Sequence, residues 1–171
     1  IALIQPNLDP YTEKFDPNNH AQHVEMFFKT ADTIIDDETQ YLFGPETLIV
    51  DQIDESDPST SIYYRNLLEF RKKYPNLNIL LGIHSYRKLS KENVPPGSRF
   101  DREKNFYYEA FNTALFLQPG AAAVPQFYHK TKLVPLFERM PFVQYLGFLG
   151  KYSLDLGGYT GTYSLRHEHT S

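Results

Sequence analysis

Apolar and polar positions recur along the chain with the periods of strands and helices, and the order of these periods predicts the fold class. A short apolar run at 1–7, IALIQPN, is stopped by Pro6 and Asn7, as expected for a buried strand that enters a loop. Apolar residues at three- and four-residue steps predict an amphipathic helix near 19–36, and YLFGPE predicts a strand near 40–45. Strand, helix and strand in succession favour a layered α/β domain over an all-helical or all-β one.

The same alternation continues up to residue 130. A second helix is predicted near 61–74, where apolar positions share one face and Pro75 follows. Polar stretches at 51–61 and 90–105 lack any period and are predicted to be loops. Three further apolar runs predict strands: near 77–86, 106–117 and 123–130. From residue 136 onward, large apolar residues and glycines mix without a period, which predicts a loop region with exposed hydrophobic side chains.

Composition limits the classes of protein that the chain can represent. Its 171 residues are 41% hydrophobic, with 13 Phe and 13 Tyr, which is enough to build one core. The net charge of -4, with basic residues scattered, argues against a general nucleic-acid binder. No apolar stretch approaches the roughly 18 residues of a membrane span, so the chain as given is expected to be soluble. It begins at Ile1 inside an apolar run, which suggests a piece of a longer protein.

Three ionisable side chains stand at the edges of apolar strands: Glu46, Lys130 and Glu138. Sites in α/β folds lie at strand ends, so these three side chains are expected to converge on one cleft. An ammonium among carboxylates favours their ionised forms, which would supply a base and an electrostatic clamp but no nucleophile.

Each of the three residues also has a simpler interpretation. Glu46 would begin a solvated loop after the Gly-Pro pair that precedes it, because that pair marks a turn. Lys130 would be an ordinary strand-end lysine, since Lys132 follows closely, and Glu138 would pair with Arg139 at the surface. From the chemistry of the residues alone, the choice stays open.

The motifs around these positions carry a resemblance. IALIQPN, GPET and YHKTKLVPLFERMPF occur in the order and approximate spacing of the carbon-nitrogen hydrolase (nitrilase) superfamily, and the chain most resembles its apolipoprotein N-acyltransferase branch. The resemblance covers essentially the whole chain. It implies that Glu46 is the general base, that Lys130 rather than Lys132 is the catalytic lysine, and that Glu138, followed by Pro141, orients the site.

The resemblance also implies a fold and a cellular setting. The fold would be a nitrilase-like α-β-β-α sandwich, with residues 1–171 forming its N-terminal part, and the parent protein would carry membrane helices upstream. The enzyme would lie in the bacterial inner membrane with its catalytic domain on the periplasmic side. It would move an acyl chain from a phospholipid to the α-amine of a lipoprotein's lipidated N-terminal cysteine, without a cofactor, a metal or nucleic acid.

Two features depart from the family pattern. Phe137 stands where the family usually has Gly before the second glutamate, which predicts a different turn there. The family's nucleophile is a cysteine on a later strand, and this chain has no cysteine. The chain is therefore expected to be a catalytic domain cut short before its nucleophile, and inactive by itself.

Alternatives remain open for the function and for two segments. A soluble nitrilase-type amidase would use the same Glu and Lys with water as acceptor, and a non-catalytic binding domain would merely pair them. The apolar segment 140–156 would be a lid over an acyl chain, a membrane-interface segment, or a surface that packs on another part of the domain. His167 and His169 lack a third spaced ligand, so no metal site is predicted.

Overall fold

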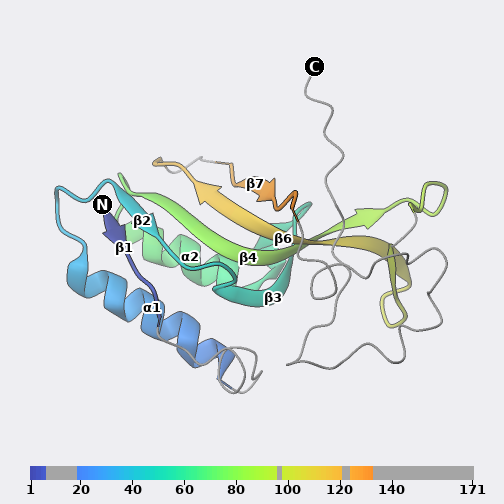
Figure 1. Ribbon diagram of the computed structural model, residues 1–171, viewed down its shortest axis with the longest axis horizontal. Coiled ribbons are helices and arrows are strands. Elements are labelled where there is room, and N and C mark those ends of the chain that lie inside the picture. The colour runs from blue at the N-terminus through green and yellow to red at the C-terminus, as the bar shows by residue number, and fades with distance from the viewer. Residues whose placement is uncertain (7–18, 96–97, 121–123, 133–171) are drawn as a thin grey trace.

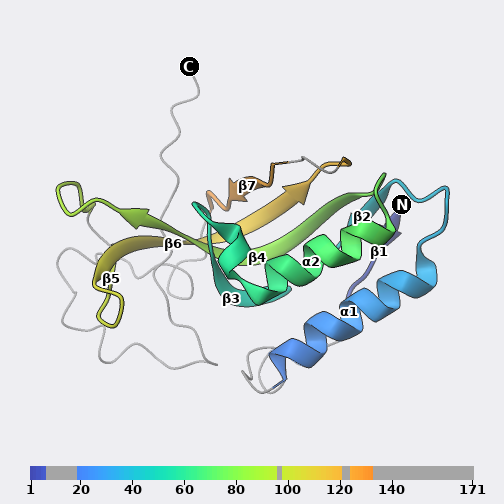
Figure 2. The same ribbon diagram turned by 180° about the vertical axis from the view of Figure 1, so that it is seen from behind.

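The computed structural model describes residues 1–6, 19–95, 98–120 and 124–132. Seven strands form one mixed sheet, and both α-helices cover the same side of it (Figures 1 and 2). The order along the sheet is β1-β2-β4-β6-β5, with β3 beside β4 and β7 beside β6. The α/β class predicted from the hydrophobic pattern is confirmed.

The helices are α1 (His20–Ile34) and α2 (Ile62–Lys73), with a short 3-10 turn, η1 (Pro58–Thr60), before α2. The strands are β1 (Ala2–Leu3), β2 (Tyr41–Phe43), β3 (Ile49–Asp54), β4 (Asn78–Leu89), β5 (Arg99–Asp101), β6 (Phe106–Leu117) and β7 (Gln126–His129). β1, β2 and β3 run parallel to β4, and β6 runs antiparallel to β4, β5 and β7. The long strands β4 and β6 form the centre of the sheet: β2 and β3 pair with β4, and β5 and β7 pair with β6.

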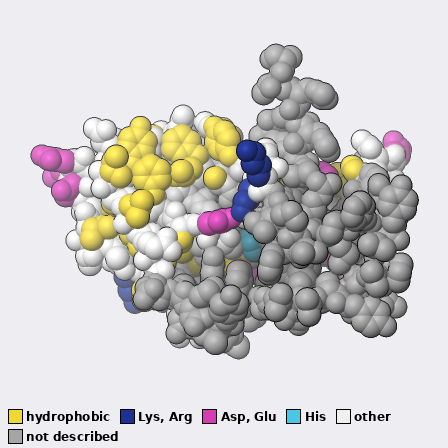
Figure 3. Space-filling model, in the orientation of Figure 1, with side chains coloured by type: hydrophobic (Ala, Val, Ile, Leu, Met, Phe, Trp, Pro, Cys, Tyr) yellow, Lys and Arg dark blue, Asp and Glu magenta, His cyan; other side chains and the backbone are white. Residues whose placement is uncertain are grey.

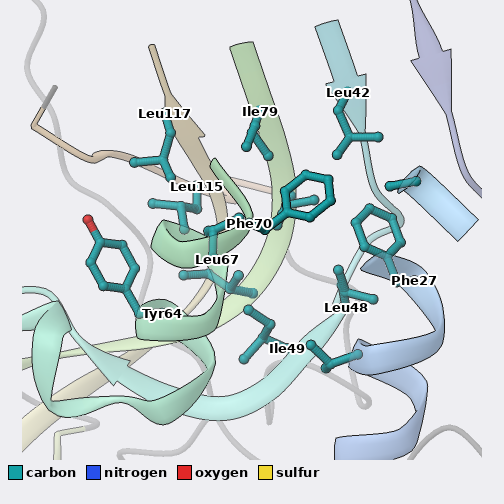
Figure 4. Packing of buried hydrophobic residues seen from close by; sticks show 14 of the residues in the cluster. Phe27, Leu42, Leu48, Ile49, Tyr64, Leu67, Phe70, Ile79, Leu115 and Leu117 are labelled. Carbon is teal, nitrogen blue, oxygen red and sulfur yellow. The ribbon is translucent and has the colours of Figure 1, made fainter. Parts of the chain in front are cut away.

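The core lies between the helices and one face of the sheet (Figure 4). Phe27 of α1 and Leu67 of α2 are fully buried against it, because apolar residues at helical spacing line one side of each helix. Ser61 caps α2 by accepting a hydrogen bond from the Tyr64 amide at 3.4 Å. The residues of the sheet that face this core include Leu42, Ile79, Leu81, Ile83, Leu115 and Leu117.

The opposite face of the sheet also carries hydrophobic side chains. Strand alternation turns Leu3, Tyr41 and Tyr128 away from the helices, and their exposed fractions are 71%, 39% and 53%. Figure 3 shows hydrophobic side chains gathered on this face. The two faces of the sheet therefore differ: one is packed against α1 and α2, and the other is apolar but exposed over these residues.

The predicted helices and five predicted strands are present, although β1, β2 and β7 are shorter than expected. Two strands were missed. The stretch 51–61, predicted to be a loop, contains the end of β3. Asp54, the last residue of this strand, can be buried because it forms an ion pair with Lys88 at 2.6 Å and accepts a hydrogen bond from the Ser56 amide at 3.0 Å. The three residues of β5 lie in the predicted 90–105 loop and form a strand only by pairing with β6. β3 pairs with β4, which is distant in sequence, whereas β5 is a three-residue edge strand beside the nearby start of β6, and propensity signalled neither of them.

Candidate active site

Glu46 lies on a turn that connects β2 to β3 and runs alongside β4, the strand with which both of them pair. The turn is bound to the middle of β4 by two hydrogen bonds of Gly82: its amide donates to the Pro45 carbonyl at 3.1 Å, and its carbonyl accepts from the Leu48 amide at 2.7 Å. Thr47, beside Glu46, has φ 60, a left-handed conformation that marks a tight turn. The position of the carboxylate is thus set by backbone contacts to a central strand.

The turn can approach β4 this closely because residue 82 is glycine. A Cβ at this position would lie 2.6 Å from the Glu46 Cα and 2.4 Å from the Thr47 amide nitrogen, both of them backbone atoms. Any side chain would therefore displace the segment that carries Glu46. The sequence LLGIH offered a signal here, since a glycine inside a strand often marks a close approach of another backbone.

Lys130 follows the last residue of β7 and reaches Glu46. Its Nζ lies 2.8 Å from the Glu46 Oε1, although the two residues are 84 positions apart in the chain. β7 is antiparallel to β6, and β6 is antiparallel to β4, so β7 points in the same direction as β2. Both residues thus follow the carboxyl ends of strands that run the same way, where α/β proteins place their sites.

Asn112 of β6 joins the two residues, and the sequence analysis missed it. Its Nδ2 donates to the Glu46 Oε1 at 2.8 Å, and its main-chain carbonyl accepts from the Lys130 amide at 2.8 Å. The side chain is buried. The sequence did offer a signal for this role: Asn112 places a side-chain amide inside the apolar strand FYYEAFNTALFL, and a buried amide needs hydrogen-bond partners.

The carboxylate and the lysine are partly open to water. Glu46 has 60% of its side-chain surface exposed and Lys130 has 32%. At such exposure an ion pair contributes only about 0–1 kcal/mol to stability. The pair therefore does little to hold the fold, and it places a carboxylate that can take a proton beside a positive charge.

A second polar cluster lies on the helix-facing side of the sheet, behind Lys130. Glu55 follows β3, and its carboxylate accepts hydrogen bonds from His129 Nε2 at 2.5 Å and from Ser85 Oγ at 2.7 Å. Arg87 also contacts this carboxylate at 3.1 Å. Burial would raise the pKa of Glu55, but the bonds from His129 and Ser85 and the charge of Arg87 outweigh it and hold the pKa below its usual value.

Several predicted features fall outside the described residues: Glu138, the segment 140–156, His167 and His169. Of the three residues expected to converge, Glu46 and Lys130 lie in contact. A groove of about 830 Å³ between α1 and α2 includes neither residue. Among the residues that the structure describes, no cluster of His, Asp or Glu could hold a metal ion. No helix in the described ranges is long and apolar enough to cross a membrane.

The fold and the site together define an α/β protein with a carboxylate and a lysine paired at strand ends. No family model matches the chain. It is similar to the apolipoprotein N-acyltransferase of Chlorobaculum tepidum, with 25% identity over 163 residues. The match covers 92% of this chain and 28% of that protein, so the chain spans little more than a quarter of the length of the curated relative it matches.

Proposed function

We propose that this chain is part of an acyltransferase that N-acylates lipoproteins, and that Glu46 and Lys130 belong to its catalytic site. The observation that carries the proposal is the 2.8 Å contact between Glu46 Oε1 and Lys130 Nζ, formed by residues 84 positions apart. The name of the Chlorobaculum tepidum relative supports the reaction class. The motifs around both residues support the assignment of each to its role.

Glu46 is the general base of the proposed reaction. It takes the proton from a cysteine thiol, because the thiolate is the competent nucleophile. The 171 residues contain no cysteine, so this thiol would come from outside them. The thiolate attacks the ester carbonyl of a phospholipid, the lysophospholipid leaves with a proton, and a thioester remains. The α-amine of the lipoprotein's lipidated N-terminal cysteine then attacks the thioester and gives its proton to Glu46.

Lys130 stabilises the negative charge that develops on the carbonyl oxygen in both steps. A lysine held by hydrogen bonds before the reaction begins needs little reorganisation in the transition state, which is the source of this kind of catalysis. Its main-chain bond to Asn112 and its side-chain contact to Glu46 provide that restraint. In the proposed site Glu138 orients these groups as a second carboxylate.

The finer fold proposed here is the nitrilase-like α-β-β-α sandwich, with residues 1–171 as its N-terminal part. The apolar face of the sheet opposite α1 and α2 supports it, because Leu3, Tyr41 and Tyr128 are the kind of side chains that a second sheet would cover. The proposed setting is the bacterial inner membrane with the site on its periplasmic side, where phospholipid and lipoprotein substrates meet.

The test is an acyl-transfer assay with a fluorescent phospholipid and a diacylated lipopeptide, using the longer protein that contains this chain. Glu46→Gln and Lys130→Ala are each expected to lower the rate by at least about 100-fold. The 171-residue chain alone is expected to be inert. Full activity in both variants would reject the assigned roles, and hydrolysis of simple amides without acyl transfer would favour an amidase instead.

A further inference from the structure

The buried cluster around His129 lies directly behind the candidate active site but takes no part in the proposed chemistry. β7 is a four-residue strand that pairs with β6 through its residues Gln126–His129. Successive side chains of a strand point to opposite faces. His129 therefore points toward the helix side of the sheet, and Lys130, the next residue, meets Glu46 on the other side.

His129 is held on two sides. Its imidazole is stacked on the Phe111 ring with 3.8 Å between centroids and 1° between planes. Its Nε2 donates to Glu55 at 2.5 Å, and only 2% of the His129 side chain and 7% of the Glu55 side chain are exposed. Loss of this bond would leave the buried imidazole without its carboxylate partner, which is costly even though Ser85 and Arg87 still contact Glu55.

Glu55 is in turn fixed by the strands beside it. Its amide donates to the Tyr86 carbonyl at 3.0 Å, which continues the pairing of β3 with β4. Ser85 donates to its carboxylate and also shares a hydrogen bond of 2.6 Å with Thr113 of β6. The cluster thus ties β3, β4, β6 and β7 together at one level of the sheet, and a network satisfied in one arrangement specifies that arrangement.

We infer that His129 and Glu55 are positioning residues for Lys130: their buried hydrogen bond fixes the end of β7, so that the lysine on the other face meets Glu46. A lysine side chain is flexible, so the position of its Cα decides where the ammonium can reach. Adjacent Cα atoms are about 3.8 Å apart, so an anchored His129 leaves Lys130 little freedom at its base. The kinetic consequence rests on the proposed function, whereas the structural one does not.

The structural test uses the 171-residue chain and NMR cross-peaks between the Lys130 and Glu46 side chains. His129→Leu is expected to lose these cross-peaks in a protein that remains folded. His129→Gln keeps an N–H donor toward Glu55 and is expected to retain them. Tyr128→Phe is the matched control on the same strand, because it removes only an exposed hydroxyl bonded to Gln126 at 2.7 Å.

A double variant separates positioning from stability. Glu55→Leu with His129→Leu removes both partners, which avoids leaving a buried charge unpaired. We expect it to fold and still to lose the cross-peaks between Lys130 and Glu46. Retained cross-peaks in this double variant would overturn the inference. Loss of folding in both His129→Leu and the double variant would also overturn it, because the pair would then hold the whole fold rather than one strand end.

The kinetic test uses the longer acyltransferase. His129→Leu is expected to lower kcat by about 10–100-fold with little change in KM, since a displacement of about 1 Å near the reacting groups has effects of this size. His129→Gln should restore most of the loss. If the enzyme shows no acyl transfer in any form, the proposed function fails, whereas the NMR result still decides the positioning role.

Discussion

The place of Glu46 is decided by two uncharged residues, Gly82 and Asn112. The apolar run around Glu46 suggested either a solvated loop or a catalytic carboxylate. The strand does end at Phe43, and Glu46 does lie on a turn. Yet the turn is bound to a central strand, and the carboxylate accepts hydrogen bonds from Asn112 and Lys130.

Replacement of Gly82 should displace this turn. In Gly82→Ala the new Cβ would meet three backbone atoms of residues 45–47 at 2.4–2.6 Å, so we expect a loss of about 1–3 kcal/mol in the free energy of unfolding, measured with urea. Gly120→Ala is the comparison, because a Cβ there meets nothing and only its φ of +104 is unfavourable. A Gly82→Ala protein as stable as the unmodified chain would contradict the close approach.

The bond from Asn112 to Glu46 should appear as an energetic coupling. A double-mutant cycle of Asn112→Leu with Glu46→Leu, which removes the accepting oxygens, is expected to give an interaction energy of about 0.5–1 kcal/mol, at the lower end for contacting residues because Glu46 is exposed. The control is Asn78→Leu, which removes an amide bonded to the Gln40 carbonyl elsewhere on the sheet. Equal coupling of both asparagines to Glu46 would show that the effect is not local.

At the scale of elements, the strongly periodic segments could be predicted and the short, polar ones could not. Helices α1 and α2 and long strands β4 and β6 follow from hydrophobic spacing alone. β3 was missed because Asp54 interrupts its pattern, and its burial depends on Lys88, 34 positions further on, together with the Ser56 amide. The proximity of Glu46 and Lys130 could be predicted from the motifs around them. The contacts of Asn112 and of the His129–Glu55 pair could not, because they form only through the pairing of distant strands.

The contact between α1 and β3 should make stability depend on pH. His20 is buried at the start of α1, and its Nε2 accepts a hydrogen bond from the Val50 amide at 3.2 Å, which requires a neutral ring. Burial lowers the pKa of His20, although the Leu48 carbonyl and Asp51 act in the opposite direction. The unfolded chain therefore binds a proton at His20 more readily than the folded chain does.

This difference sets the sign of the pH dependence. Above the ordinary histidine pKa of about 6.5 the residue is neutral in both states and contributes no pH dependence. As the pH falls below that value, stability should decrease until the lowered pKa of the folded state is reached. Urea unfolding between about pH 8 and pH 5 measures it. His20→Asn should flatten the curve relative to the matched His23→Asn, and identical curves for the two variants would refute it.

At the scale of the whole molecule, the sheet has one packed face and one open apolar face. Leu42 points into the core and is fully buried, whereas Leu3 on the neighbouring strand is 71% exposed on the opposite face. Leu42→Ala should cost about 2–5 kcal/mol, and Leu3→Gln should change stability by less than about 0.5 kcal/mol. Both are measured by urea unfolding. A large loss in Leu3→Gln would mean that the folded chain covers this face.

The central proposal is that Glu46 and Lys130 act as one catalytic unit. The most direct measurement is acyl-transfer kinetics of the two single variants and their double variant in the proposed longer acyltransferase. When two groups act as one unit, the losses in rate caused by removing each of them are strongly non-additive. We predict that Glu46→Gln with Lys130→Met lowers kcat/KM hardly more than the more damaging single variant does. If the two losses multiply, or if either single variant keeps full activity, the residues do not form the unit that their 2.8 Å contact suggests.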